Sequence, residues 1–476
     1  MATTIVTENK ISFNELEKKI FRAACKEACR YTKELPERYD DTLAKERNRK
    51  DYRDKGKRTT SIKTVYGEVS YSRRVYETHT ETGDKKYVYL LDQELEMEKI
   101  GLISTNLGEK IAACIVEMPY RIAAERISDT SGQSISHGGI WNFVQSLGEK
   151  LKTEEEKAVE VMNSDKATGE KAIPVLFEEM DGLWLKIQGK GGKKAPGAEM
   201  KVSTIYEGWD AENPHRLMGK TVMAGMEDSD SFLEKREAKI CEKYDVTRIE
   251  QRVLNGDGGS WITDPYDENT IEQLDRFHVI KEIRAKIADK EYAKKLGKLL
   301  EEEKTGELIE AVQIYADSIA NNDPDDRREE KALELKRYLE NHREKLKHYD
   351  NRGIKIPEAP EGIVYKYMGV QENQNATVIA MRMKHGRKRW SKTGADHMAK
   401  LLCSHENGEL IEAIRRYTDG EITEKVTEGI EVLSATKSPK ADGKGNNPYI
   451  ERFGCHLPVL DSSNAGAVRL FRGLIG

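Results

Sequence analysis

The chain has 476 residues, of which 34% are charged and 37% are hydrophobic. At roughly 150 residues per domain, this length predicts about three domains with enough apolar residues for a core. No apolar run approaches the ~18 residues of a membrane helix and no signal-peptide pattern opens the chain, so we expect neither a membrane-embedded nor a secreted protein. The net charge of −5 gives no general attraction to nucleic acid, although such binding depends on local patches. Six irregularly spaced cysteines do not make a disulfide framework, and we expect a reducing, cytoplasmic environment.

The first hundred residues predict a charged helix followed by a small β unit. In this helix Leu16, Ile20 and Ala24 lie on one side. A basic run, KERNRKDYRDKGKR, then leads into strands in which apolar residues alternate with polar ones. We therefore expect residues 1–57 to be an N-terminal charged helical segment and residues 58–98 to be the β unit.

From about residue 99 the apolar spacing becomes helical. A helix over Tyr120–Ser128 and a second helix capped by Ser136 are joined by a turn that contains Gly132. This pattern matches a helix-turn-helix, whose second helix can lie in the major groove of DNA; an ordinary helical hairpin is the alternative. We expect residues 99–165 to form this helical, DNA-binding unit. The outward side chains of its second helix, which would contact DNA, are His137, Asn142 and Gln145.

The rest of the chain is predicted to be an α/β core with a helical insertion. Short apolar strands alternate with helices up to about residue 282, which favours a sheet covered by helices. The next seventy residues are almost wholly helical and rich in Lys and Glu, and a linker punctuated by prolines follows them. The boundaries we expect are 166–282 for the first part of the core, 283–361 for the insertion, 362–424 for the second part of the core with a basic helix, and 425–476 for a C-terminal tail.

Three acidic residues stand where a sheet and a late helix can bring them together. Asp181 follows a strand in AIPVLFEEMDGLWLKI, at an exposed strand end or hairpin, and Asp257 follows a short apolar strand in LNGDGG. Glu372 begins a helix in YMGVQENQN, after the helical insertion. Clusters of carboxylate oxygens select Mg²⁺ or Mn²⁺, and two such ions can activate a water or a 3′-hydroxyl in phosphodiester chemistry. Each position alone also fits a tight turn or a helix N-terminus.

Three further polar residues are second-tier candidates. Strand alternation puts Glu179 on the same side as Asp181, which makes it an accessory metal ligand or the true first acid. Asp275 and His278, in LDRFHV, are expected to touch DNA or to support the metal site. A salt-bridged strand end and a hydrogen-bonded histidine are the structural alternatives for this pair.

The densest basic patch, RMKHGRKRWSK, comes soon after Glu372. Arginine binds phosphate through two parallel hydrogen bonds, and an aromatic ring can stack on an unpaired base. A run of charges is commonly just a solvated face, but the position of this one favours contact with DNA. The candidates in the patch are Arg382, Lys384, Arg387, Arg389 and Trp390.

The sequence has no zinc-finger spacing, Ser-His-Asp signature, phosphate-binding GxxxxGKS loop or GxGxxG after a strand.

Seven motifs follow one another between about Arg58 and Leu402. They are RTTSIKTVYGEVSYSRRVY, YRIAAERISDTSGQSISHGGIWNFVQ, MDGLWLKIQG, LNGDGGSWI, DRFHVIKEI, YLENHREKLKHYDNRGI and VQENQNATVIAMRMKHGRKRWSKTGADHMAKLL. With these motifs in this order, the chain resembles bacterial insertion-sequence transposases of the DDE type, most closely the ISLre-type group, long grouped as an uncharacterised protein family. The last motif is the most specific, because an acid followed by an RMK…RWS…GA…M…L tail recurs in neighbouring transposase families.

The resemblance implies a multidomain α/β fold: a ribonuclease-H-like mixed-sheet core with a helical insertion between the second and third acids, preceded by the β unit and the helix-turn-helix. It implies that Asp181, Asp257 and Glu372 are the catalytic residues and hold two Mg²⁺ or Mn²⁺ ions. The implied function is a DNA transposase that binds its element's terminal inverted repeats, hydrolyses a phosphodiester and transfers the freed 3′-hydroxyl to target DNA. Because two ends must be joined, we expect a homo-oligomer on DNA. The alternatives are a non-catalytic repressor, meaning a domesticated or inactive transposase, and a nuclease without strand transfer.

Overall fold

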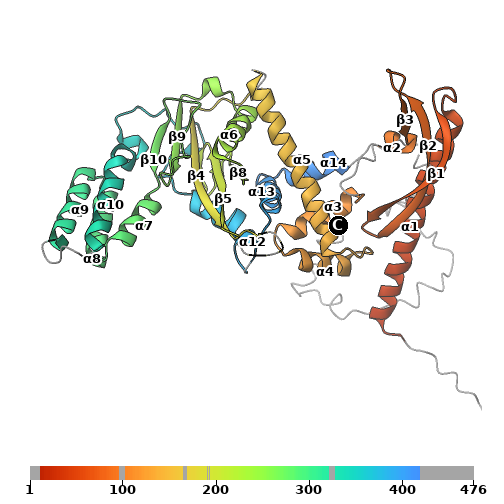
Figure 1. The fold of residues 1–476 in the computed structure, drawn as a ribbon, viewed down its shortest axis with the longest axis horizontal. Coiled ribbons are helices and arrows are strands. Elements are labelled where there is room, and N and C mark those ends of the chain that lie inside the picture. The colour runs from red at the N-terminus through yellow and green to blue at the C-terminus, as the bar shows by residue number, and fades with distance from the viewer. Residues whose placement is uncertain are drawn as a thin grey trace, which may run out of the picture. The chain divides into compact units, whose positions relative to one another are not determined.

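The computed structural model describes residues 11–95, 102–164, 169–189, 191, 193, 195–320, 327–386 and 388–418. The expected C-terminal tail, residues 425–476, and Arg387 lie outside the described residues. The described elements make a multidomain α/β structure with three sheets (Figure 1). Within this part of the chain, none of the helices combines the length and the apolar character that crossing a membrane requires.

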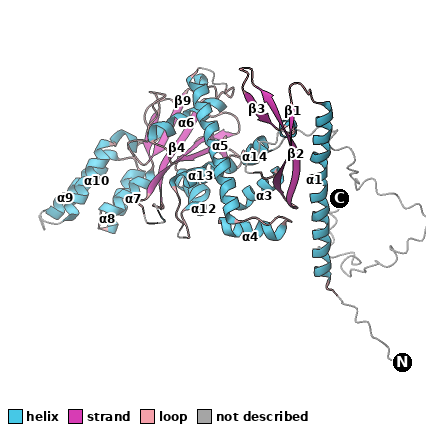
Figure 2. Ribbon diagram, turned by 45° about the vertical axis from the view of Figure 1, so that its right-hand side comes forward, coloured by secondary structure: helices cyan, strands magenta, loops and turns pink. Residues whose placement is uncertain are grey.

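The helix and β unit predicted for the start of the chain are present. Helix α1 (Phe13–Glu46) begins with a capping box, in which Ser12 and Glu15 satisfy each other's backbone N–H groups. α1 packs on the second strand of an antiparallel sheet (Figure 2), and buried Asp40 accepts hydrogen bonds from the backbone N–H and guanidinium of Arg74 at 3.0 and 2.7 Å. In order, the sheet strands and the helix after them are β1 (Arg53–Thr64), β2 (Gly67–His79), β3 (Lys85–Val88) and α2 (Leu90–Glu94).

A mixed five-stranded sheet forms the centre of the α/β core, as expected. In the order of hydrogen-bonded neighbours, its strands are β10 (Ile271–Leu274), β9 (Gln251–Gly256), β4 (Val175–Leu185), β5 (Ala198–Tyr206) and β8 (Thr221–Gly225). The chain runs antiparallel from β4 to β5 to β8, whereas β9 and β10 lie parallel to β4. A small third sheet contains β11 (Ile363–Val364), β6 (Gly208–Asp210) and β7 (Leu217–Met218).

The alternation of side chains along β4 gives the main sheet two different faces. On one face lies helix α6 (Ser229–Lys243) (Figure 1). It packs over Leu176 and Met180. The other face carries Glu179 and Asp181. The helical segments that pack on this second face are α11 (Gln371–Gln374), a π-helical turn (Asn375–Ala380), α12 (Met381–Met383) and α13 (Lys392–Glu406).

A helical segment follows β10, as the sequence predicts between the second and third acids. Its helices are α7 (Arg276–Lys286), α8 (Lys290–Glu301), α9 (Thr305–Ala320) and α10 (Arg327–Asn341). They share one hydrophobic cluster, in which Leu335, Leu339 and Leu346 all take part. Because α7 packs with the helices after it, this segment begins at Arg276 rather than at the expected residue 283.

The region of the predicted helix-turn-helix is helical, and its second helix is long. The helices are α3 (Thr105–Ile115), α4 (Tyr120–Thr130) and α5 (His137–Asn163). Ser136 caps α5 as predicted, since its Oγ accepts the N–H of Gly139 at 3.1 Å. With 27 residues, α5 packs on α3 and α4 through its first turns and on α6 and α13 of the core further along.

α5 and α13 cross so closely at Gly148 that no side chain fits there. A Cβ atom on Gly148 would lie 2.3 Å from Cβ and 2.7 Å from Cα of His397. We therefore expect Gly148→Ala to lower the free energy of unfolding by about 1–3 kcal/mol, because the backbone of α13 must shift. The matched control is Gly297→Ala in α8, where nothing lies within 4 Å of a Cβ and alanine should stabilise the helix slightly. Urea unfolding measures both, and equal stabilities would contradict the close crossing.

Candidate functional site

Strands β4 and β9 bring the first two predicted acids together. The strands are parallel neighbours, and Met180 of β4 pairs with Gly256 of β9. The next residues along them are Asp181 and Asp257, so the two carboxylates leave adjacent positions. β4 does not end there but pairs with β5 as far as Leu185, and Asp181 is buried. The prediction of an exposed strand end or hairpin at Asp181 is therefore wrong.

His278 links these two acids to the third one. It lies in the first turn of α7, and its Nε2 is 3.7 Å from Oδ2 of Asp181 and 3.2 Å from Oε1 of Glu372. Glu372 lies at the start of α11, as predicted. Three residues each place one potential ligand atom within 4.8 Å of the ligand atoms of the other two: Asp181, Asp257 and His278. Three of these side chains thus lie together, and the fourth, that of Glu372, reaches them through His278. We call the four residues the acid cluster: Asp181, Asp257, His278 and Glu372.

The charges in the acid cluster favour a bound cation. The pKa of the Asp181 carboxyl is raised to about 6, chiefly by burial; Asp257 and Glu372 raise it as well, whereas His278 and the N–H of Gly182 oppose the rise. A divalent cation offsets such repulsion between carboxylates, and carboxylate oxygens suit Mg²⁺ and Mn²⁺. The residues present therefore fit a divalent metal ion.

Asn375 orients the first acid, a contact that the sequence analysis missed. Its Nδ2 donates to Oδ2 of Asp181 at 2.6 Å, and its own Oδ1 accepts from Nε2 of Gln371 at 2.9 Å. Both amide side chains are buried. The spacing of Gln371 and Asn375 in QENQN indicates a hydrogen bond along a helix. The contact with Asp181 joins residues 194 positions apart, so no local pattern indicates it.

Glu179 lies on the same face as Asp181, as predicted, but it does not point its oxygens toward a free site. The side chain is fully buried, and both carboxylate oxygens accept hydrogen bonds from protein groups, three of which are the backbone N–H groups of residues 369–371. Burial raises the pKa of this carboxyl, and these donors oppose the rise. The prediction of Glu179 as an accessory ligand or as the first acid is wrong, because its lone pairs are already used.

Asp275 caps the helix that carries His278. Its Oδ1 accepts the N–H of Phe277 at 2.7 Å, and its Oδ2 accepts from Nδ2 of Asn255 at 3.3 Å. Because Asp275 is buried, the predicted contact with DNA is wrong for this residue. It supports the acid cluster indirectly, by starting α7 in the right place.

The predicted outward side of α5 is exposed at only two of its three candidate residues. His137 and Asn142 are exposed, as predicted. Gln145 is half-buried, and its Oε1 lies 3.0 Å from Nδ1 of His397 on α13. The prediction of Gln145 as a free DNA contact is therefore wrong, because α13 covers this side of the helix.

Arg382 and Trp390, two of the five residues predicted to bind DNA after Glu372, belong to the core. Arg382 donates its Nε–H to the carbonyl of Ile115 at 2.5 Å, and its guanidinium carbon lies 5.5 Å from the ring centroids of both Tyr120 and Trp390. Trp390 donates its Nε1–H to the carbonyl of Met383 at 2.9 Å. Both side chains are buried, so the predicted phosphate contact and base stacking are wrong.

For the other three candidate residues of this basic patch, contact with DNA stays a prediction. Lys384 and Arg389 are exposed. Gln188, just after β4, donates its Nε2–H to the carbonyl of Arg389 at 3.0 Å, which fastens the patch to the end of that strand. Arg387 lies outside the described residues, and its role stays a prediction.

We expect Arg382→Ala to affect stability rather than DNA affinity. The change removes one buried hydrogen bond and two cation–π contacts, which should cost about 2–3 kcal/mol of unfolding free energy. Lys384→Ala, at an exposed site two residues on, should leave stability unchanged and weaken DNA binding. Urea unfolding and DNA binding at fixed salt measure both variants. A stable Arg382→Ala protein with weakened DNA binding would reverse the two assignments.

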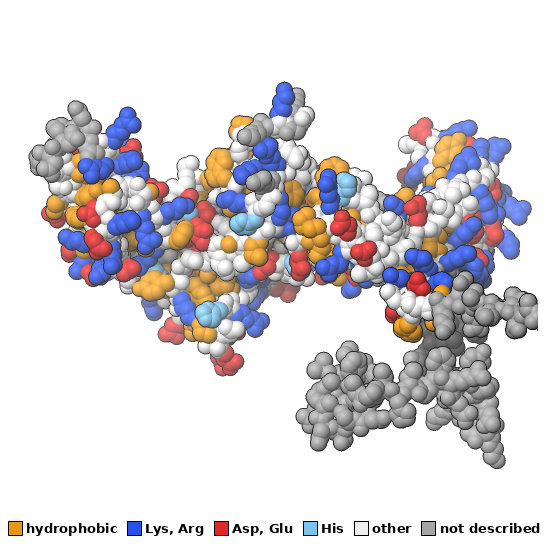
Figure 3. All heavy atoms as spheres, turned by 90° about the horizontal axis from the view of Figure 1, so that it is seen from below, with side chains coloured by type: hydrophobic (Ala, Val, Ile, Leu, Met, Phe, Trp, Pro, Cys, Tyr) orange, Lys and Arg blue, Asp and Glu red, His pale blue; other side chains and the backbone are white. Residues whose placement is uncertain are grey.

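Exposed basic side chains also occur on the N-terminal β unit. Lys and Arg side chains gather on the right-hand part of the molecule in Figure 3, where this unit lies. The exposed basic residues of β1 and β3 are Arg53, Lys57, Arg58, Lys85 and Lys86. Such a surface attracts phosphate groups despite the negative net charge of the chain.

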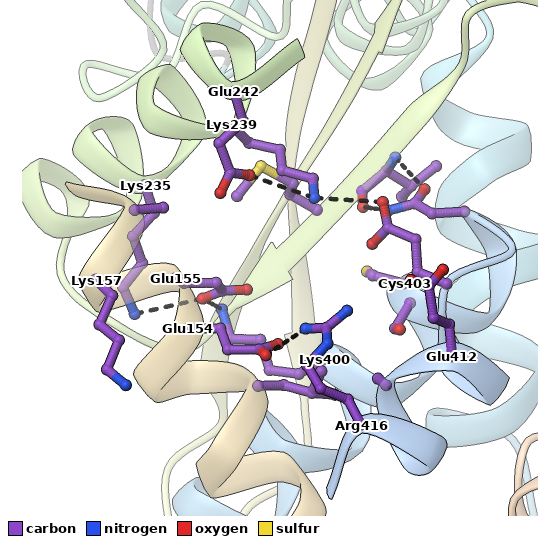
Figure 4. Close-up of a pocket in the computed structure, with 18 of the residues that line it drawn as sticks. Glu154, Glu155, Lys157, Lys235, Lys239, Glu242, Lys400, Cys403, Glu412 and Arg416 are labelled. Atoms are coloured by element: carbon purple, nitrogen blue, oxygen red, sulfur yellow. Dashed lines mark hydrogen bonds and ion pairs between the residues drawn. The ribbon is translucent and has the colours of Figure 1, made fainter. Parts of the chain in front are cut away.

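A cavity of about 570 Å³ lies away from the acid cluster, between α5, α6, β8, α13 and α14 (Leu410–Thr418) (Figure 4). Basic and acidic side chains in its walls form ion pairs. Glu155 contacts Lys400 at 2.7 Å and Lys235 at 3.5 Å, and Glu154 contacts Arg416. No residue predicted from the sequence to carry function lines it. These ion pairs connect α5 with α6, α13 and α14, so we assign them a structural role.

The fold and the acid cluster together define an α/β protein with a candidate divalent-metal site. The model of an uncharacterised protein family, UPF0236, matches residues 6–419, and the chain belongs to this family. A UPF0236 protein of Streptococcus gallolyticus, named for its place in the vanSb 3′ region, is 25% identical over 356 residues, 72% of each chain. A UPF0236 protein of Caldanaerobacter subterraneus subsp. tengcongensis is 25% identical over 412 residues, 85% of this chain and 78% of that one. The name of the second relative carries eleven locus designations.

Proposed function

We propose that this protein is a DNA transposase of the DDE type, of the ISLre-type group that its sequence resembles. The observation that carries the proposal is the meeting of Asp181, on β4, with Asp257, directly after the parallel neighbour β9, and with His278. Glu372, on a helix that follows a long insertion, lies 3.2 Å from His278. The mixed five-stranded sheet, with a helical segment that follows its last strand and precedes the third acid, supports a ribonuclease-H-like core.

In this proposal Asp181, Asp257 and Glu372 hold two Mg²⁺ or Mn²⁺ ions, with His278 beside them. When bound, the ions supply Lewis-acid activation for phosphodiester hydrolysis and for strand transfer by the freed 3′-hydroxyl. The protein itself aligns the ligands. Asn375 fixes Oδ2 of Asp181, and the N–H of Gly182 binds Oδ1 at 2.7 Å. The first acid is thus held in one orientation before any ligand arrives.

We propose that DNA binds to α5, to the β unit and to the exposed lysine and arginine that follow Glu372. His137 and Asn142 project from the first turns of α5, and Lys384 and Arg389 are free to reach backbone phosphates. Phosphate contacts of this kind make binding strongly salt-dependent. Because two element ends must be cut and joined, the protein acts on its terminal inverted repeats and target as a homo-oligomer, in the cytoplasm.

The eleven locus designations of one relative support the proposal. A gene that encodes the transposase of its own element spreads to new positions together with that element. Many copies in one genome are therefore expected for such a gene, and they are not expected for a metabolic enzyme or a structural protein.

The competing functions are a non-catalytic repressor and a nuclease without strand transfer. The test uses a short duplex from the DNA that flanks the gene, a plasmid target, and Mg²⁺ or Mn²⁺. We expect a metal-dependent cut at the element end, followed by duplex joined covalently to the plasmid. Cut duplex without joined product would favour the nuclease, and binding without any cut would favour the repressor. No binding would refute the DNA assignment itself.

A further inference from the structure

Glu179 occupies a position between the acid cluster and the middle of the sheet. It lies two residues before Asp181 on β4 and has no exposed surface. Tyr206 of β5 donates its hydroxyl to Oε1 at 2.7 Å, and Asn255 of β9 donates Nδ2–H to Oε2 at 3.1 Å. The remaining three donors are the consecutive backbone N–H groups of residues 369–371, at 3.0 to 3.2 Å. One carboxylate thus joins two strands to a segment 190 residues further along the chain.

The segment that Glu179 holds leads directly into Glu372. Three successive N–H groups directed at one carboxylate form a backbone nest for an anion. The nest depends on Gly369, whose φ of +127° lies where glycine is favoured. A Cβ there would meet nothing within 4 Å, so only the backbone conformation restricts this position.

Glu372 itself has few other constraints. Its side chain is 40% exposed, and its described ionic partner is His278. A long, partly exposed carboxylate must lose rotamer freedom when it binds a metal ion, and a firmly placed backbone reduces that cost.

We propose that Glu179 is a positioning residue: it anchors residues 369–371 to β4 and thereby places Glu372 at the acid cluster, beside His278. It makes no contact with the metal ion. The inference rests on the proposed function, because it takes the acid cluster as a metal site. It predicts that damage to either side of the anchor weakens metal binding even though every ligand is still present.

A titration of the full-length protein with Mn²⁺, followed by the electron paramagnetic resonance of free Mn²⁺, tests this without DNA. Glu179→Gln keeps the size of the side chain but turns an NH₂ group toward the donors. We expect it to weaken Mn²⁺ binding about tenfold, as removal of groups that orient metal ligands commonly does. Asp396→Asn is the matched control, since this buried carboxylate accepts the N–H of Met226 at 2.9 Å away from the cluster. It should lose comparable stability and keep the Mn²⁺ affinity of the wild type.

A second pair of variants tests the anchor from the side of the nest. Gly369→Ala strains the backbone that presents the N–H groups, and we expect it to weaken Mn²⁺ binding in the same direction as Glu179→Gln. Gly362→Ala is its control, because Gly362 has a φ of +80° and equally open surroundings seven residues earlier in the chain, before β11. It should not change the affinity. If Glu179→Gln fails to fold, this pair decides.

The outcomes separate the inference from the proposed function. Unchanged Mn²⁺ affinity in folded Glu179→Gln and Gly369→Ala proteins would overturn the positioning role and leave the metal site intact. Equal, negligible Mn²⁺ binding by the wild type and by Asp181→Asn would overturn the metal site, and the inference with it. Weaker binding in both anchor variants, with both controls at the wild-type value, supports the inference.

Discussion

Replacing Asp257 by asparagine is expected to remove metal-dependent DNA cleavage, with a loss of about 10³-fold or more in rate, because a metal ligand is worth several kcal/mol of transition-state stabilisation. DNA binding should stay near the wild-type value. The amide keeps the size of the side chain and its oxygen can still accept the N–H of Gly259, which Oδ1 accepts at 2.7 Å. Only the negative charge that faces the cation is lost. The cleavage rate and the dissociation constant for DNA, at one salt concentration, measure the two effects separately.

The matched control for this variant is Asp267→Asn in the same loop. Oδ1 of Asp267 likewise accepts a backbone N–H, that of Asn269 at 2.9 Å, but the residue is not part of the acid cluster. It should cleave DNA at the wild-type rate. Joint loss of cleavage and DNA binding in Asp257→Asn would give Asp257 a role in folding and would remove it from the metal site.

The second large effect is expected on the α6 face of the sheet, where buried charges form a network. Arg236 has no exposed surface and lies 3.3 Å from Glu178 and 3.1 Å from Asp264. Arg236→Met leaves these carboxylates short of a cation in the interior, which should cost about 3–5 kcal/mol of unfolding free energy. The same substitution at Arg30, whose ion pairs are half-exposed, should leave the urea midpoint close to the wild type. Equal stabilities of the two variants would contradict the role of the network.

The pH dependence of the Arg236→Met variant has a definite sign. Burial raises the pKa of the Glu237 carboxyl. Two guanidinium groups oppose that rise: that of Arg252, which lies 2.8 Å from the carboxylate, and that of Arg236. Without Arg236 the pKa of Glu237 rises further. A carboxyl whose pKa is higher in the folded state binds more protons when folded, so stability recovers as the pH falls through that pKa. The deficit against the wild type should therefore be smaller at about pH 5.5 than at about pH 7.5. A deficit that grows at the lower pH would contradict the assignment.

The elements that carry the acids were predictable because local patterns define them. The apolar strand before LNGDGG predicts the place of Asp257, and β9 ends one residue before it. Glu372 follows the linker at a helix start, where it was expected. The Asp-Gly pair resembles a turn and so predicts a strand end at Asp181, whereas pairing with β5 extends the strand past it. Strand length here depends on a partner that the local sequence does not indicate.

The burial of polar side chains was not predictable, since distant elements cause it. Apolar periodicity shows one buried side of α5, but α13 covers a second side and takes up Gln145. The charge run after Glu372 looks like a solvated surface, yet the carbonyl at the end of α3 and an aromatic ring of α4 bury Arg382. Alternation predicts the side of the sheet on which Glu179 lies but not its partners, three of which lie 190 to 192 residues away.

The most direct measurement is a map of DNA ends on a plasmid that carries the gene with its natural flanking DNA. The purified protein and the Asp257→Asn variant are incubated with this plasmid, with Mg²⁺ or Mn²⁺ and without, and all free 3′ ends are sequenced. The proposed function predicts metal-dependent breaks at the two ends of the element that are absent with the variant. Breaks scattered over the plasmid, or identical patterns for the two proteins, would contradict it.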